Sequence, residues 1–125
     1  MAIYIEIKTD NRVKEIVPHL LEIDGFILTG EIDSMNYGEG FDFKYKDLSI
    51  RLFDDERTDE VLADENFQTN KETYEEVFSR IVDTNKGETT LRIEIDRFDQ
   101  NTDIQVEAAD LIKQNLKTKK YDIAL

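Results

Sequence analysis

The sequence contains no cysteine, a single histidine and a single proline. Without cysteine there are no disulfides, no thiolate nucleophiles and none of the common cysteine-ligated zinc sites. A nucleophilic triad would depend entirely on His19, which stands beside Pro18 on a predicted helix, while the three serines show no nucleophile motif. We interpret His19 as a structural or surface residue. The sequence therefore predicts a protein that is not an enzyme, with no catalytic residue, metal or cofactor.

Long apolar runs and an excess of basic residues are also missing. The first ten residues, MAIYIEIKTD, lack the basic start and apolar centre of a signal peptide, so we expect a soluble cytoplasmic protein with no membrane contact. Sixteen lysines and arginines stand against 29 acids, a net charge of −13. This balance disfavours direct binding to nucleic acid, because phosphate contacts need a basic surface. It favours a basic protein surface as the partner.

Regular alternation of apolar and polar residues is clearest in segment 41–53, FDFKYKDLSIRLF. This period of two predicts a β-hairpin with Lys46 and Asp47 as its turn. A two-residue turn there places the apolar side chains on one face, which we interpret as a core face rather than a stacking platform for bases. The predicted cross-strand pairs are Tyr45 with Leu48, Phe43 with Ile50, Phe41 with Leu52 and, on the polar face, Asp42 with Arg51.

Further strands are predicted at 3–7, 26–32 and 91–95, and an apolar stripe at helical spacing covers 13–21. Inside that helix, Pro18 predicts a kink or a restart. Two capping-box patterns, 69–72 and 102–105, predict two more helix starts. The order β-α-β-β-β-α-β-α predicts a single α+β domain spanning 1–125, with helices on one face of a largely antiparallel sheet of about five strands. Segment 54–68 is predicted to be an acidic loop or a weak helix.

Acidic residues are concentrated directly after the hairpin. Segment 54–76 holds ten acids and two bases, a net charge of −8. We predict that these acids form a partner-binding surface: Asp54, Asp55, Glu56, Asp59, Glu60, Asp64, Glu65, Glu72, Glu75 and Glu76. Carboxylates spread over such a surface can imitate phosphate spacing and occupy the nucleic-acid groove of an enzyme. The sequence hypothesis is an inhibitor or immunity-type protein that occludes a positively charged surface of its partner.

Three alternatives stay open. The acidic run can be a solvated face that keeps a small protein soluble. It can also hold a metal, as can segment 99–110, which resembles a calcium loop but has Ile104 at the position where that loop needs glycine. The third alternative is a binder of a small phosphorylated or nucleotide ligand, held by Arg51, Arg92 and Arg97 if their strands are neighbours. Separately, an open edge of the hairpin would invite a partner strand.

Overall fold

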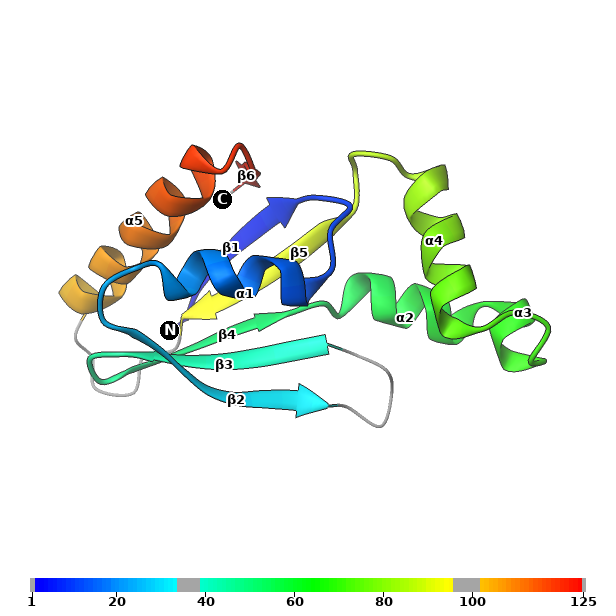
Figure 1. Ribbon diagram of the computed structural model, residues 1–125, viewed down its shortest axis with the longest axis horizontal. Helices are drawn as coiled ribbons and strands as arrows, with labels where there is room; N and C mark the ends of the chain where they lie inside the picture. The colour runs from blue at the N-terminus through cyan, green and yellow to red at the C-terminus, as the bar shows by residue number, and fades with distance from the viewer. Residues whose placement is uncertain (1, 34–38, 96–101, 125) are drawn as a thin grey trace.

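The computed structural model describes residues 2–33, 39–95 and 102–124. Its strands are β1 (Ile3–Lys8), β2 (Phe26–Asp33), β3 (Glu39–Tyr45), β4 (Leu48–Phe53), β5 (Thr90–Ile95) and β6 (Asp122–Ala124). Its helices are α1 (Val13–Leu21), α2 (Glu56–Ala63), α3 (Glu65–Gln68), α4 (Tyr74–Thr84) and α5 (Thr102–Thr118) (Figure 1). The strands form one antiparallel sheet in the order β2-β3-β4-β5-β1-β6. The predicted α+β fold is confirmed, with β6 as a strand that the sequence did not indicate.

The hairpin of β3 and β4 has the predicted register. Tyr45 pairs with Leu48, and the ladder continues through the predicted partners to Phe41 and Leu52. On the polar face, Arg51 Nε donates to Asp42 Oδ1 at 2.9 Å. Lys46 has a φ of +54°, the left-handed conformation that lets a tight turn follow the twist of its strands. Alternation together with a two-residue turn was therefore enough to predict this register.

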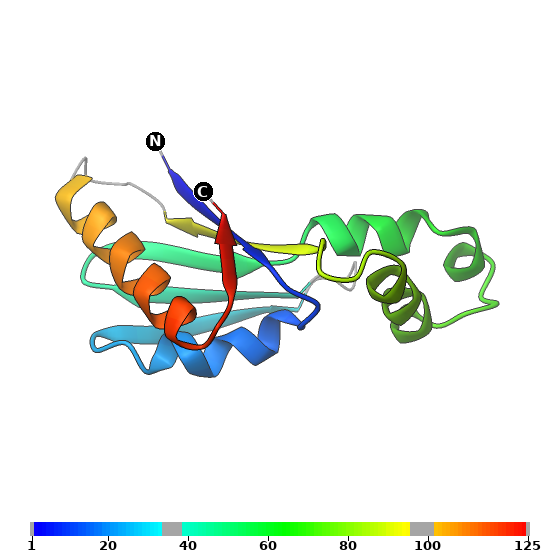
Figure 2. The ribbon, with the colours of Figure 1, turned by 90° about the horizontal axis from the view of Figure 1, so that it is seen from above.

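Helices α1 and α5 cover one face of the sheet and enclose the main core (Figure 2). α1 contributes Val13, Ile16 and Leu20, while α5 contributes Ala108, Ile112 and Leu116. Both sets pack against the alternating apolar residues of the strands. α1 runs as one helix through Pro18, so the predicted restart is wrong. Pro18 lies on the exposed side of α1, where solvent can satisfy the carbonyl that loses its backbone donor.

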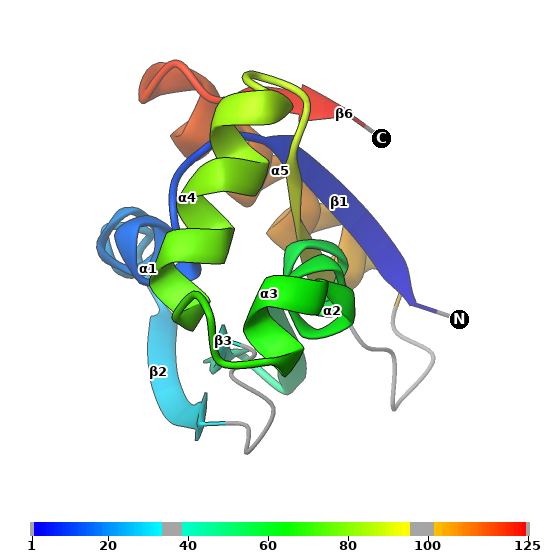
Figure 3. The same cartoon turned by 90° about the vertical axis from the view of Figure 1, so that its right-hand side faces the viewer.

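The connection from β4 to β5 forms a helical lobe, which we define as α2, α3 and α4, residues 56–84. The lobe extends beyond the end of the sheet (Figures 1 and 2). Figure 3 views the molecule from the side of the lobe. It has its own small core, separate from the main one, formed by Val61, Tyr74, Val77, Phe78 and Ile81, with Phe67 and Val82 packed against it. The segment predicted as an acidic loop or a weak helix is thus two helices.

One of the two predicted helix starts needs correction. Thr73 and Glu76 form the box that opens α4, with each side chain accepting from the other's backbone N–H at 3.2 Å. The predicted pair, Thr69 and Glu72, precedes it by one turn. The helix start predicted at 102–105 agrees with the structure, because α5 begins at Thr102. The buried side-chain amide of Gln105 donates to the Ile95 carbonyl at 2.9 Å and fastens the helix to β5.

Candidate functional site

The structure distributes the ten predicted acids unevenly. Three are half-buried (Asp55, Asp64 and Glu72), one is buried (Asp54), and six are exposed: Glu56, Asp59, Glu60, Glu65, Glu75 and Glu76. All six exposed acids lie on the helical lobe, because its short apolar stripes turn inward and leave the polar positions outside. The acidic run is therefore mainly the outer surface of a folded element.

Asp54 does not belong to that surface. It is 4% exposed, and its carboxylate Oδ2 lies 2.8 Å from Nε of Arg57, which is 1% exposed. The second carboxylate oxygen of Asp54 accepts the backbone N–H of Arg57 at 3.2 Å. A buried charge is tolerated only when it is paired and hydrogen-bonded, as it is here. Asp54 is thus an internal counter-ion and is unavailable to a partner protein.

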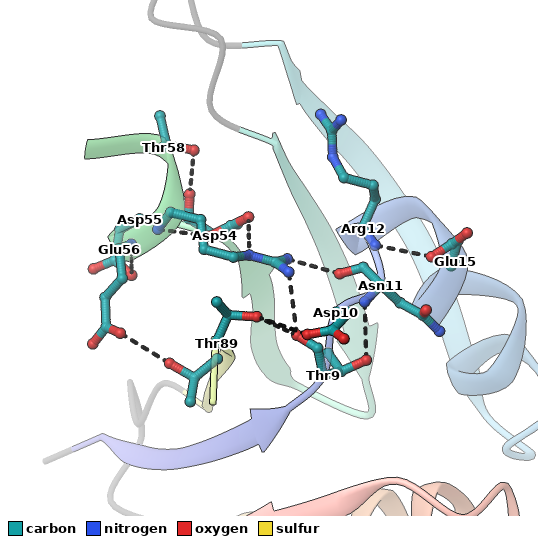
Figure 4. A network of polar contacts seen from close by, with 12 residues as sticks. Thr9, Asp10, Asn11, Arg12, Glu15, Asp54, Asp55, Glu56, Thr58 and Thr89 are labelled. Atoms are coloured by element: carbon teal, nitrogen blue, oxygen red, sulfur yellow. Dashed lines mark hydrogen bonds and ion pairs between the residues drawn. The ribbon is translucent and has the colours of Figure 1, made fainter. Parts of the chain in front are cut away.

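Arg57 joins the lobe to the body of the protein. Its terminal nitrogens donate to the backbone carbonyls of Thr9 at 3.2 Å and Asn11 at 2.8 Å. Figure 4 shows Thr9 and Asn11 in the turn between β1 and α1. Its guanidinium carbon lies 4.9 Å from the centre of the Phe78 ring, on α4. We call this set of contacts the Arg57 anchor. It links three segments that are far apart in the sequence.

A second arginine reinforces the same junction from the surface. The guanidinium of Arg12 lies 4.3 Å from the Phe78 ring and pairs with Glu75 at 2.6 Å. The Phe78 ring therefore contacts two cations, and each cation has its own carboxylate partner. Such contacts are attractive because the negative face of an aromatic ring meets positive charge. They orient α4 relative to α1.

Asp55 and Glu56 are drawn toward the sheet. Arg92, on β5, lies 3.6 Å from the Asp55 carboxylate and 3.4 Å from that of Glu56. The other oxygen of Glu56 accepts from the Thr90 hydroxyl at 2.9 Å. These two acids are thus partly neutralised and help to seat the start of α2 on the sheet.

Asp64 and Glu72 form a cluster around Arg80. One terminal nitrogen of Arg80 lies 2.9 Å from each carboxylate, and the side-chain amide of Asn66 donates to Glu72 at 2.7 Å. The hydrogen bond from Arg80 lowers the pKa of Asp64. The pKa of Glu72 is lowered first by Asn66 and then by Arg80. Both groups are held in the charged form.

The remaining acids face solvent. Within residues 39–95 and the other described ranges, Asp59, Glu60 and Glu65 make no ion pair.

An open hollow runs along the outer side of α4, lined by Glu72, Glu75, Glu76, Ser79, Arg80, Asp83 and Thr84. The predicted acidic run ended before Asp83. Helical spacing could have identified Asp83 as part of the acidic surface, since it follows Glu76 by seven residues, two turns along the same face of the helix.

The arrangement gives little support to the other predicted sites. Arg51 and Arg92 do lie on neighbouring strands, but Arg51 pairs with Asp42 and Arg92 with Asp55 and Glu56. Arg97 lies outside the described residues, as do Asp99 and Asn101 of the calcium-loop pattern. Among the residues that the structure describes, no group of three or more acids or histidines could hold a metal ion. His19 packs its ring 5.6 Å from that of Tyr121.

Comparison with known proteins gives no family for this chain. No family model matches it, and neither the curated proteins nor the solved structures yielded a match. Over the described ranges, no helix combines the length and the apolar composition needed to cross a membrane. The functional argument therefore depends on the chemistry of the lobe itself.

Proposed function

We propose that this chain is a non-enzymatic acidic interaction protein, whose helical lobe binds and occludes a positively charged surface of a partner protein. The partner class is a protein that handles nucleic acid, since such a protein exposes lysines and arginines that neutralise phosphates. The observation that carries the proposal is the outward placement of Asp59, Glu60 and Glu65 without cationic partners within the described residues.

Position and charge together favour this role over simple solubilisation. The lobe extends beyond the sheet, so a concave surface could receive it without meeting the body of the protein (Figure 1). The Arg57 anchor holds the lobe in one orientation, which reduces the ordering cost of binding. Inhibition would follow from occlusion. Electrostatic steering would make association fast at low salt and slower as salt screens the charges.

The test is retention of partners by two matched triple variants. The lobe variant reverses Asp59, Glu60 and Glu65 to lysine, and the control variant reverses Asp103, Asp110 and Asp122, which are exposed on α5 and β6. Each variant changes the net charge by the same amount. In a pull-down from lysate at low salt, the wild type and the control are expected to retain the same basic proteins and to release them at high salt. The lobe variant is expected to retain none of them.

Two results would count against the proposal. Equal loss in both variants would mean that only the bulk charge matters, and the solvated-face interpretation would then hold. Retention by the lobe variant would place the binding surface elsewhere on the protein. Far-ultraviolet circular dichroism of both variants checks that each remains folded, as the exposure of all six reversed positions leads us to expect.

A further inference from the structure

The two edges of the sheet differ in how well they are protected. β6 forms one edge, is three residues long and follows the lysines at the end of α5. β2 forms the other edge, is eight residues long and pairs only with β3 within the described residues. Short strands, lysine and proline are the usual means of blunting an edge against further pairing. β2 has none of these, and only the bulge between Leu28 and Gly30 interrupts it.

The side chains of β2 also leave apolar surface at this edge. Ile27 is 62% exposed and Leu28 is 41% exposed, and the alternation of a strand directs them to opposite faces of the sheet. An added strand would cover both side chains while its backbone pairs with the outer N–H and C=O groups of β2. The edge therefore offers backbone hydrogen bonds and apolar contact together.

Charge decides which strand can be added. Residues 22–33, which comprise β2 and the turn before it, include four acids and no basic residue: Glu22, Asp24, Glu31 and Asp33. Glu22 pairs with Lys119 at 3.0 Å, so the local charge argument depends on the other three acids. A second copy of this chain is unsuitable as the added strand, because each copy carries a charge of −13 and the two copies repel each other. Pairing of the full strand with its own antiparallel copy would also set Leu28 opposite Glu31. A segment with basic residues among apolar ones has the complementary charge.

We propose that the outer edge of β2 accepts an extended basic segment of a partner protein as a seventh strand. This inference goes beyond the proposed function, because it concerns a different surface and stands whether or not the lobe binds a partner. Acidity has a dual effect at this edge: repulsion keeps copies of the chain from pairing, and the same charge attracts a cationic strand.

The probe is a synthetic nine-residue peptide of alternating valine and lysine with capped ends, titrated at low salt and followed by nuclear magnetic resonance. Shifts are expected at residues 26–31, with slowed exchange of the β2 amides that do not donate to β3. A peptide methylated on alternate backbone nitrogens is expected to bind at least about tenfold more weakly, because it cannot complete the ladder. Equal binding by the methylated peptide would overturn the proposal.

Two single charge-reversal variants separate the effect of the charge at β2 from the effect of the net charge of the protein. Glu31→Lys, on β2, is expected to weaken peptide binding by roughly tenfold, while Glu60→Lys, on the lobe, changes the net charge equally and is expected to weaken it by less than about twofold. Equal weakening would overturn the proposal, as would shifts confined to the lobe or unchanged β2 resonances at roughly millimolar peptide. Peptide binding at β2 alongside a failed lobe pull-down would reject the proposed function alone.

Discussion

At the scale of single residues, Arg57 is the most consequential side chain of the described structure. Burying a guanidinium is costly unless each of its donors finds an acceptor. Arg57 reaches the carboxylate of Asp54 and the carbonyls of Thr9 and Asn11, so its charge and its hydrogen-bonding groups are both satisfied. The same residue also supplies the cation that contacts Phe78. Its loss would affect the lobe and the body of the protein together.

We expect Arg57→Met to lower the free energy of unfolding by about 3 to 5 kcal/mol, because Asp54 would keep a buried charge without its partner. Urea denaturation measures the loss. In the double variant with Asp54→Asn the loss is expected to be smaller than with Arg57→Met alone, since no uncompensated carboxylate remains. Additive losses in the double variant would mean that the two side chains are not energetically coupled.

The Arg80 cluster predicts a pH effect. The pKa of Glu72 is lowered by Asn66 and then by Arg80, and that of Asp64 by Arg80, so the contribution of Arg80 to stability is complete above the ordinary values of 3.8 and 4.5. It is lost as the pH falls through the lowered pKa values of the folded state. The melting temperature of wild type is thus expected to exceed that of Arg80→Gln at pH 7, and the difference is expected to vanish below those values. A difference that stays constant on acidification would contradict this assignment.

At the scale of elements, the two apolar clusters make the lobe and the sheet separate packing units. The lobe core and the main core share no residue, and polar side chains such as Arg57, Arg12 and Arg92 make contacts between the lobe and the rest of the described structure. Regions with few apolar contacts to the rest of a protein open locally at a lower free energy than the global one. We therefore expect the lobe to open without the sheet.

Two isoleucine truncations test this separation. Ile81→Ala, in the lobe core, and Ile93→Ala, in the main core, are each expected to cost about 2 to 5 kcal/mol. Ile81→Ala should speed amide hydrogen exchange in α2–α4 and leave β1 and β5 protected, while Ile93→Ala should speed exchange throughout. Uniform acceleration by both variants would show that the chain unfolds as one cooperative unit.

The sequence predicted the sheet better than the lobe, for a physical reason. Strands buried on one face alternate visibly, so the register of β3 and β4 followed from the residues alone. The inward positions of α2 are Arg57, Thr58 and Val61, and two polar residues among three hide an apolar stripe. The buried role of Asp54 was equally invisible, because a paired carboxylate and a solvated one look alike until the chain is folded.

The start of α4 was predicted one turn too early because the sequence contains two capping-box patterns in succession. Residues 69–72 and 73–76 both read T-x-x-E. The second pattern caps α4, because Tyr74 is the first residue of the apolar stripe and follows Thr73 directly. The earlier pattern lies in a turn where Asn70 has a φ of +60° and Lys71 donates its backbone N–H to the Asn66 carbonyl at 2.8 Å. A capping box is informative only when it adjoins the stripe.

At the scale of the whole molecule, the net charge of −13 opposes folding through self-repulsion. Much of the excess lies in segment 54–76, where screening by salt should relieve it. We expect the melting temperature to rise as salt increases from about 10 mM to about 150 mM, because the Debye length falls from about 30 Å to about 8 Å. Scanning calorimetry measures the shift.

The lobe variant provides the comparison for that experiment. Reversal of Asp59, Glu60 and Glu65 adds two charges at each position and brings the net charge from −13 to −7. Its melting temperature is expected to rise less with salt than that of the wild type. A fall with salt in both proteins would mean that favourable surface ion pairs, such as Asp42 with Arg51, outweigh the repulsion.

The place of the lobe in the chain has a further consequence. β4 and β5 are adjacent antiparallel strands, with Phe53 opposite Arg92, so the chain leaves and re-enters the sheet at neighbouring points. The lobe is topologically an excursion within a hairpin. A short turn could join the two strands in its place without altering any register of the sheet. The lobe, and with it the proposed recognition of a partner, could thus be exchanged by natural variation or by grafting, on a scaffold that keeps its own core.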